Sequence, residues 1–217
     1  MSLLPLFPLD LVLLPGVHQP LHIFEPRYKE MIAECIEQKK PFGIVRAADQ
    51  GVAAIGCTAE IVSVTKKYDD GRMDILTRGV RRFEVIEMNQ DRSFLQAEIT
   101  MVEDEPGEPA PDLVDRTVRL YKEIARLAGA DSSAADAGIA AAGDRTADGE
   151  GKAAPEGQTP DRPQGLSFLM AGSLPLDLDF KQNLLSTLSE VERLEHLAEY
   201  LQAVLPGLRR AARARWN

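Results

Sequence analysis

The sequence predicts an α+β protein, in which a small sheet of mostly antiparallel strands with one embedded helix precedes a helical part. Over most of residues 1–104, apolar and polar residues alternate with the period of a strand. From about residue 110 the apolar period changes to that of an amphipathic helix. We therefore divide the chain into a β subdomain of residues 1–104 and a helical subdomain of residues 105–217.

The composition indicates a folded protein. The chain has 217 residues, of which 44% are apolar, and a formal net charge of −9. This charge argues against a general nucleic-acid-binding protein, because phosphate binding is expected to require a basic face. Cys35 and Cys57 stand among apolar residues, which predicts buried free thiols and a cytoplasmic location. The leucine-rich start contains Asp10 and several prolines without a basic leader, so we expect neither a signal peptide nor a membrane span.

In the first region, short extended runs are separated by glycine, proline and aspartate. One helix interrupts them and begins at Pro26, a residue type that is favoured at the first helical position. Its apolar face consists of Tyr28, Met31, Ile32, Cys35 and Ile36. Asp70 and Gly71 lie between two alternating runs and predict a tight hairpin turn. We expect this sheet to be closed or strongly curled, because only then is its apolar face buried.

The segment "HQPLHIF" contains two histidines four residues apart, His18 and His22. On a helix this spacing can bind a metal, but Pro20 between them disfavours a helix. In a strand the two residues are about 13 Å apart, which is too far for one zinc ion. We therefore predict a strand and no metal site.

The helical region contains three apolar-periodic stretches and one segment without a period. Asp112 is a candidate N-cap of the first helix, and Gly129 is its predicted end. Residues 130–165 are rich in alanine, glycine, aspartate and proline, and we expect a flexible acidic insertion there. Ser189 and Glu192 form a capping box, which divides the last stretch into helices of about 177–187 and 189–204.

Several blocks of the sequence resemble, in the right order, the N-terminal substrate-binding domain of Lon proteases. They are "LPLFPLDLVLLPG", "PLHIFEPRYKEMI", "FGIV", "IGCTAEI", "GVRRFEV" and "LPLDLDFKQNLLSTLSEVERLEHLAEYL". The resemblance runs from residue 4 to about residue 204 and omits only the insertion. It implies a pseudo-barrel similar to the PUA-like folds, followed by a helical-bundle subdomain.

The resemblance also implies a function. A Lon protease continues into an ATPase module and a protease module, whereas this sequence has neither a phosphate-binding loop nor a Gly-x-Ser-x-Gly elbow. We therefore expect no catalytic activity and no cofactor. The implied function is recognition of unfolded or extended polypeptide segments in support of protein quality control or proteolysis, with a protease or chaperone in trans as a further partner.

Two groups of residues are candidates for binding. Glu25, Arg27 and Tyr28 stand where the first helix begins. The two charged residues either stabilise this junction, by capping or by an ion pair, or contact a partner. Tyr28, with Phe24 and Phe83, is more typical of a core aromatic.

The second group lies in "TRGVRRFEV". Strict alternation predicts that Arg81 is buried and paired, on the side of Phe83, and that Arg78 and Arg82 are exposed. Gly79 is a candidate bulge that would change this register.

Two functions remain open from the residues. The first is protein recognition, through an apolar groove or by strand addition at an uncovered sheet edge. The second is RNA binding, suggested by the PUA-like resemblance and by a basic cluster. The cluster consists of Arg78, Arg81, Arg82, Lys66 and Lys67. The acidic net charge makes a nucleic-acid partner the less favoured of the two. A small-molecule pocket inside the sheet is a third reading, and the basic residues 208–216 form either a solvated helix end or a docking tail.

Overall fold

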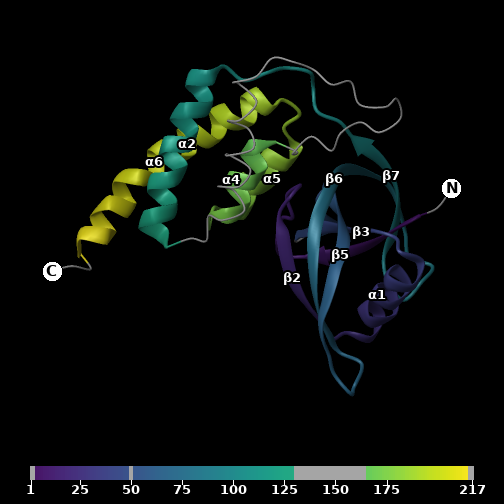
Figure 1. Ribbon diagram of the computed structural model, residues 1–217. Helices are drawn as coiled ribbons and strands as arrows, with labels where there is room; N and C mark the ends of the chain where they lie inside the picture. Colours follow the sequence, from purple (N-terminus) through teal and green to yellow (C-terminus); the bar gives the residue numbers. More distant parts are fainter. Residues whose placement is uncertain (1–2, 49–50, 130–164, 215–217) are drawn as a thin grey trace, which may run out of the picture. The chain divides into compact units, whose positions relative to one another are not determined.

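The computed structural model describes residues 3–48, 51–129 and 165–214, which form two compact units (Figure 1). The first unit comprises Met1–Glu103 with Asp177–Ser186, and the second comprises Asp104–Leu176 with Thr187–Asn217. This division differs from the expected subdomains chiefly in residues 177–186, which belong to the unit of the strands. The insertion expected at residues 130–165 lies, except for Gly165, outside the described residues.

Seven strands build the first unit. They are β1 (Leu4–Leu9), β2 (His18–Ile23), β3 (Phe42–Ala48), β4 (Gly51–Val52), β5 (Ile55–Lys67), β6 (Met73–Asn89) and β7 (Gln96–Val102). The strands β1, β7, β6, β5 and β3 form a ring that closes where β3 pairs with β1 in parallel. All other pairings recorded between these strands are antiparallel, and β2 and β4 attach outside the ring to β6 and β3. The predicted α+β pseudo-barrel of mostly antiparallel strands is confirmed.

Alternate residues of the ring fill its interior. Leu6, Val45, Phe83 and Ala97 form a buried cluster at its centre. A Cβ atom on Gly43 would lie 2.7 Å from both Leu6 and Phe83, so only glycine leaves room for these side chains. The alternation expected from the sequence thus becomes a barrel core.

The helix α1 (Pro26–Gln38) packs against the barrel through most of the face that the sequence predicts, but Ile36, which was expected on that face, is 37% exposed. Its buried residues are Tyr28, Met31, Ile32 and Cys35. Arg92, in the connection between β6 and β7, binds the helix from outside, since its guanidinium contacts Glu30 at 2.9 Å and also pairs with Glu34. The embedded helix is therefore tied to the sheet by both apolar and charged contacts.

The helix α5 (Leu178–Ser186) belongs to the first unit rather than to the helical one. Leu184 and Leu185 are buried. At its start, Asp179 accepts a hydrogen bond from Arg46 Nη1 at 2.5 Å. One turn later, Gln182 Nε2 donates to the carbonyl oxygen of Ile55 at 3.0 Å. These contacts explain why a helix of the second half of the sequence docks on strands of the first.

The second unit contains the helices α2 (Pro111–Ala128), α4 (Leu166–Ser173) and α6 (Glu190–Ala214). α2 and α6 lie side by side (Figure 1). Gly129 ends α2 in the left-handed conformation, as predicted. Asp112 lies in the first turn and makes no side-chain cap, because Pro111 already begins the helix.

The helix α6 is longer than predicted. It runs through Pro206 to Ala214, whereas the sequence predicts an end near residue 204. Proline lacks an N–H group and interrupts one helical hydrogen bond. Pro206 is exposed, so water can bind the carbonyl group that it leaves free. Among the described residues, no helix is both long enough and apolar enough to span a membrane.

Candidate functional site

The junction between β2 and α1 brings together an ion pair and an exposed aromatic ring. Arg27 Nη2 lies 2.8 Å from Glu25 Oε2. The side chain of Glu25 pairs with this arginine and does not cap the helix. Tyr28 is buried against Phe7, with the two ring centroids 4.1 Å apart. Phe24, predicted to be a core residue, is 58% exposed, so that prediction is wrong.

A polar cluster lies beside Phe24. His22 stacks on Phe24 with a centroid distance of 5.9 Å, and its Nδ1 donates to Asp74 Oδ1 at 2.5 Å. The hydroxyl group of Tyr68 donates to the other oxygen of Asp74 at 2.9 Å. The hydrogen bond from His22, followed by that from Tyr68, lowers the pKa of Asp74. The exposed ring of Phe24 is therefore bordered by hydrogen-bonded polar side chains, His22 and Asp74.

In "GVRRF" the structure reverses the expected sides of Arg81 and Arg82. Arg82 is only 3% exposed, and its Nη1 donates to the carbonyl oxygen of Leu185 in α5 at 2.9 Å. Arg81 is exposed and pairs with Glu103. The reason is the docking of α5 on the outer side of the sheet, where Arg82 points.

A bulge beside Gly79 accompanies this reversal. β5 and β6 shift register between the pairs Cys57–Arg82 and Ala59–Gly79. Thr58 bridges the irregular position, because its hydroxyl group accepts from the N–H of Arg81 at 3.0 Å and donates to the carbonyl of Arg81 at 3.1 Å. Arg82 and Phe83 are both buried although they lie on opposite sides of the sheet: Phe83 belongs to the barrel core, and Arg82 is covered by α5.

The arginines of the basic cluster expected for RNA are paired or buried, whereas Lys66 and Lys67 have no recorded carboxylate partner within the described residues. Arg78 pairs with Glu60 at 2.7 Å, and Arg81 pairs with Glu103. Arg82 is buried. Lys66 lies over the ring of Tyr68, 4.5 Å from its centroid. These arginines therefore offer little free positive charge to a phosphate backbone.

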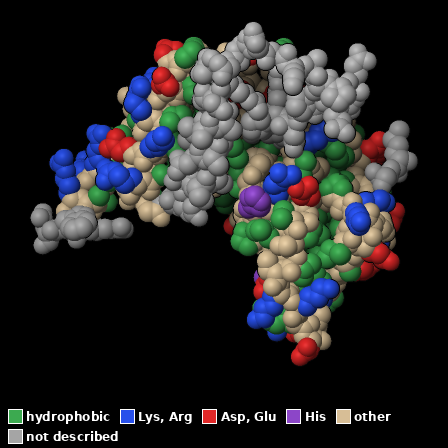
Figure 2. All heavy atoms as spheres, in the orientation of Figure 1, with side chains coloured by type: hydrophobic (Ala, Val, Ile, Leu, Met, Phe, Trp, Pro, Cys, Tyr) green, Lys and Arg blue, Asp and Glu red, His purple; other side chains and the backbone are tan. Residues whose placement is uncertain are grey.

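Exposed apolar side chains gather in the first unit. Among the described residues, six of the seven exposed large apolar side chains belong to it. Three of the six, Ile86, Met88 and Met101, are spread along the paired strands β6 and β7, with Met101 opposite Phe83 and Met88 opposite Ala97. We call this set of exposed side chains the β6–β7 apolar patch. Figure 2 shows hydrophobic side chains spread over the visible face of the strands.

An irregularity in the pairing of β6 with β7 accounts for the exposure of Ile86. The register shifts between Val85 and Glu87, which leaves Ile86 without a partner in the ladder and 57% exposed. Met88 and Met101 are 46% and 39% exposed. Methionine is flexible and polarizable, which suits contact with varied apolar partners. Sequence reasoning missed these residues; the available signal was three apolar residues near the ends of alternating runs.

Within the described ranges, no group of three or more histidine, cysteine, aspartate or glutamate side chains is arranged to hold a metal ion. His18 and His22 lie on an extended strand, as predicted. Both thiols, Cys35 and Cys57, are free and buried, also as predicted, and burial raises their pKa to about 11 and about 12.

Comparison with known proteins gives related domains over nearly the whole chain. The Lon protease 1 of Hydrogenovibrio crunogenus is 25% identical over 203 residues, which is 89% of this chain and 23% of that protein. The Lon protease of Parabacteroides distasonis is 31% identical over 122 residues, or 52% of this chain and 14% of that protein. The chain thus spans less than a quarter of the length of these two relatives.

Solved structures agree with these relatives. The Lon N-terminal domain protein from Xanthomonas campestris has a TM-score of 0.65 at 25% identity, covering 92% of this chain and 99% of that chain. The N-terminal domain of the Mycobacterium avium complex Lon protease has a TM-score of 0.61 at 19% identity, covering 93% and 98%. The family model of the ATP-dependent protease La (LON) substrate-binding domain matches residues 3–203. The chain therefore belongs to the family of Lon substrate-binding domains.

Proposed function

We propose that this domain binds unfolded or extended polypeptide segments without catalysing a reaction, and that the β6–β7 apolar patch is the main contact. The family supports substrate recognition of the Lon type. The observation that carries the proposal is the concentration of exposed apolar side chains on the strand unit of such a domain. Unfolded chains expose apolar residues that a folded protein buries, so they are the partners that such a patch attracts.

The patch can bind varied segments with modest affinity. Its two methionines adapt their shape to different side chains. Phe24, with the polar border of His22 and Asp74, offers a second exposed apolar contact on the same unit. The Glu25–Arg27 pair beside it is a candidate polar contact for a client backbone. Bound clients would pass to a protease or chaperone in trans, in support of protein quality control.

The described residues do not favour the RNA-binding alternative. Arg78 and Arg81 are already paired with carboxylates, and Arg82 is covered by α5. A cytoplasmic location is part of the proposal. Its support is the pair of buried free thiols, Cys35 and Cys57, which suit a reducing compartment.

The first test is fluorescence anisotropy of the full chain with a labelled, permanently unfolded polypeptide. We expect saturable binding that survives high salt, because burial of apolar surface does not depend on ionic screening. The double variant Ile86→Ser, Met88→Ser should bind about tenfold or more weakly, since it removes two apolar contacts.

The control variant is Leu188→Ser, which removes an apolar side chain of similar exposure, 40%, from the second unit. It should bind like the unchanged protein. Equal losses in both variants, or no polypeptide binding at all, would contradict the proposal. Binding only to a labelled structured RNA, with a steep loss in salt, would replace it with the RNA-binding alternative.

A further inference from the structure

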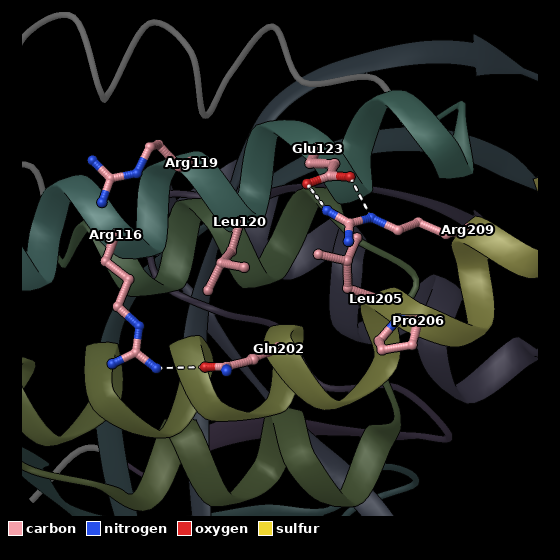
Figure 3. Close-up of a pocket in the computed structure, with 8 residues that line it drawn as sticks. All are labelled: Arg116, Arg119, Leu120, Glu123, Gln202, Leu205, Pro206 and Arg209. Carbon is pink, nitrogen blue, oxygen red and sulfur yellow. Dashed lines mark hydrogen bonds and ion pairs between the residues drawn. The ribbon is translucent and has the colours of Figure 1, made fainter.

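The second unit carries a basic groove that the proposed function does not use. It lies between α2 and α6 and has a volume of about 600 Å³, within the range of ligand sites (Figure 3). The lining residues are Arg116, Arg119, Leu120 and Glu123 of α2, and Gln202, Leu205, Pro206 and Arg209 of α6. Lys and Arg side chains gather over this part of the two helices (Figure 2).

Two of the three arginines in the groove have no carboxylate partner among the described residues. Arg116 Nη2 donates to the neutral amide oxygen of Gln202 at 2.5 Å. Arg119 makes no recorded hydrogen bond or ion pair within the described ranges. Elsewhere the pattern is different. Arginines paired with carboxylates are Arg27, Arg46, Arg72, Arg78, Arg81, Arg92 and Arg193. Three arginines outside the groove also have no recorded carboxylate partner within the described ranges, and they stand on the same two helices: Arg126, Arg210 and Arg213. Unpaired arginines thus gather on α2 and α6, and Arg116 and Arg119 are the ones that line the groove.

Glu123 shows how a carboxylate is held in this groove. Its two oxygens accept from Arg209 Nε at 2.8 Å and Nη2 at 2.9 Å (Figure 3). This two-point geometry is the preferred one for arginine and carboxylate. Arg116 and Arg119 are three residues apart on α2, so their side chains are neighbours on the helix surface. In Figure 3 Arg116 reaches towards Gln202 of α6, whereas Arg119 extends away from α6, so the two guanidinium groups lie at different edges of the groove.

The groove also has an apolar floor. Leu205 is buried and Leu120 is half-buried, and Pro206 lies beside them. An apolar floor between guanidinium groups fits a peptide in which an apolar side chain lies between acidic ones. Leu205, Pro206 and Arg209 follow the last residue, 203, that the family model matches. The groove is therefore built partly from residues outside the matched family region.

We propose that the α2–α6 groove binds an acidic segment of a partner protein, in which carboxylates flank an apolar side chain the size of leucine. The free charges on Arg116 and Arg119 attract the carboxylates, and the floor receives the apolar side chain. A nucleic acid fits less well. Its polar backbone gains nothing from contact with Leu120 and Leu205.

The test is fluorescence anisotropy of the full chain with a labelled short peptide of glutamate residues around one leucine. Unchanged protein should bind it, and the affinity should fall with salt. The double variant Arg116→Gln, Arg119→Gln should bind about tenfold or more weakly, because two charge-assisted contacts are lost. Both residues are exposed, so the fold should persist, as circular dichroism would verify.

Two further variants make the test specific to the groove. Arg210→Gln, Arg213→Gln removes the same charge from exposed positions of α6 that do not line the groove, and should bind nearly as the unchanged protein does. Glu123→Gln should bind several-fold more tightly, because it releases Arg209 and removes a like charge. A peptide with glutamine in place of glutamate should not bind.

Three results would overturn the proposal. The unchanged protein could fail to bind the acidic peptide, or the two double variants could lose affinity equally, which would indicate general charge attraction. Tighter binding of an oligouridylate than of the peptide, with the same dependence on Arg116 and Arg119, would assign the groove to nucleic acid. None of these outcomes affects the β6–β7 apolar patch, whose test uses another probe and other variants.

Discussion

At the scale of single residues, Asp74 has the most clearly defined environment next to the exposed Phe24. Its carboxylate accepts hydrogen bonds from His22 and Tyr68, which lower its pKa. A lowered folded-state pKa means that this interaction stabilises the fold above about pH 4, the ordinary pKa of aspartate. The contribution is lost as the pH falls through the lower folded-state value.

We predict that His22→Ala raises the pKa of Asp74 towards its ordinary value, because the hydrogen bond from His22 is the largest cause of the shift. The measurement is an NMR titration of the Asp74 carboxyl carbon. His18→Ala is the control, since it removes an exposed histidine from the same strand that makes no recorded contact with Asp74. An unchanged pKa in His22→Ala would show that Tyr68 or the backbone holds the carboxylate.

At the scale of elements, the start of α6 depends on one buried arginine. Arg193 is fully buried and pairs with Asp104 at 2.5 Å and with Glu190 at 2.8 Å. It also donates to the hydroxyl group of Ser167, at the start of α4, and to the carbonyl oxygen of Thr187. One guanidinium group thus joins α4, α6 and the segment that precedes α2.

We predict that Arg193→Leu lowers the free energy of unfolding by about 3–5 kcal/mol, because it leaves the largely buried Glu190 without its charge partner. Arg193→Lys should lose part of this stability, since lysine has the charge without the planar fork. Urea unfolding followed by circular dichroism measures both. Arg213→Gln, in the exposed last turn of the same helix, should cost a few tenths of a kcal/mol. If Arg193→Leu also lowered the free energy of unfolding by only a few tenths of a kcal/mol, the predicted role of the Arg193–Glu190 ion pair would be wrong.

At the scale of the whole molecule, the first unit is expected to unfold as one body, because its core is a closed ring of strands with α1 and α5 packed on it. The reactivity of Cys35 and Cys57 can measure the unfolding of this unit, because both thiols are buried and they belong to different elements, α1 and β5. Burial raises their pKa to about 11 and about 12. The thiols therefore favour the folded state below about pH 8.5, and this preference is lost as the pH rises towards the folded-state values.

We predict that neither thiol of the native protein reacts with a thiol reagent near neutral pH and that both become reactive at the same urea concentration. The single variant Cys35→Ala assigns the two signals. Separate midpoints would show that α1 detaches before the barrel opens. The free energy of unfolding, measured with urea, should fall between about pH 9 and pH 11, because the thiols ionise at a lower pH in the unfolded state than in the folded state.

How much could be predicted from the sequence depends on the range of the interaction. The start of α1 at Pro26, the hairpin at Gly71 and the end of α2 at Gly129 follow from local patterns, and the structure agrees with them. Of the candidate binding residues, Tyr28 was expected to be core and is buried. Phe24, an aromatic four residues earlier that directly follows β2, was also expected to be core, yet it is 58% exposed, because none of the described elements covers it.

The sequence by itself determined the period of each region, the family blocks and therefore the α+β barrel, since these depend on neighbours along the chain. Only the tertiary structure decided which arginine of "RR" is buried, because α5, a hundred residues away, covers Arg82 and leaves Arg81 outside. It likewise decided that Ile86, Met88 and Met101 remain exposed and that a groove forms between α2 and α6. Packing between distant segments sets exposure, and exposure selects the surfaces that are available for binding.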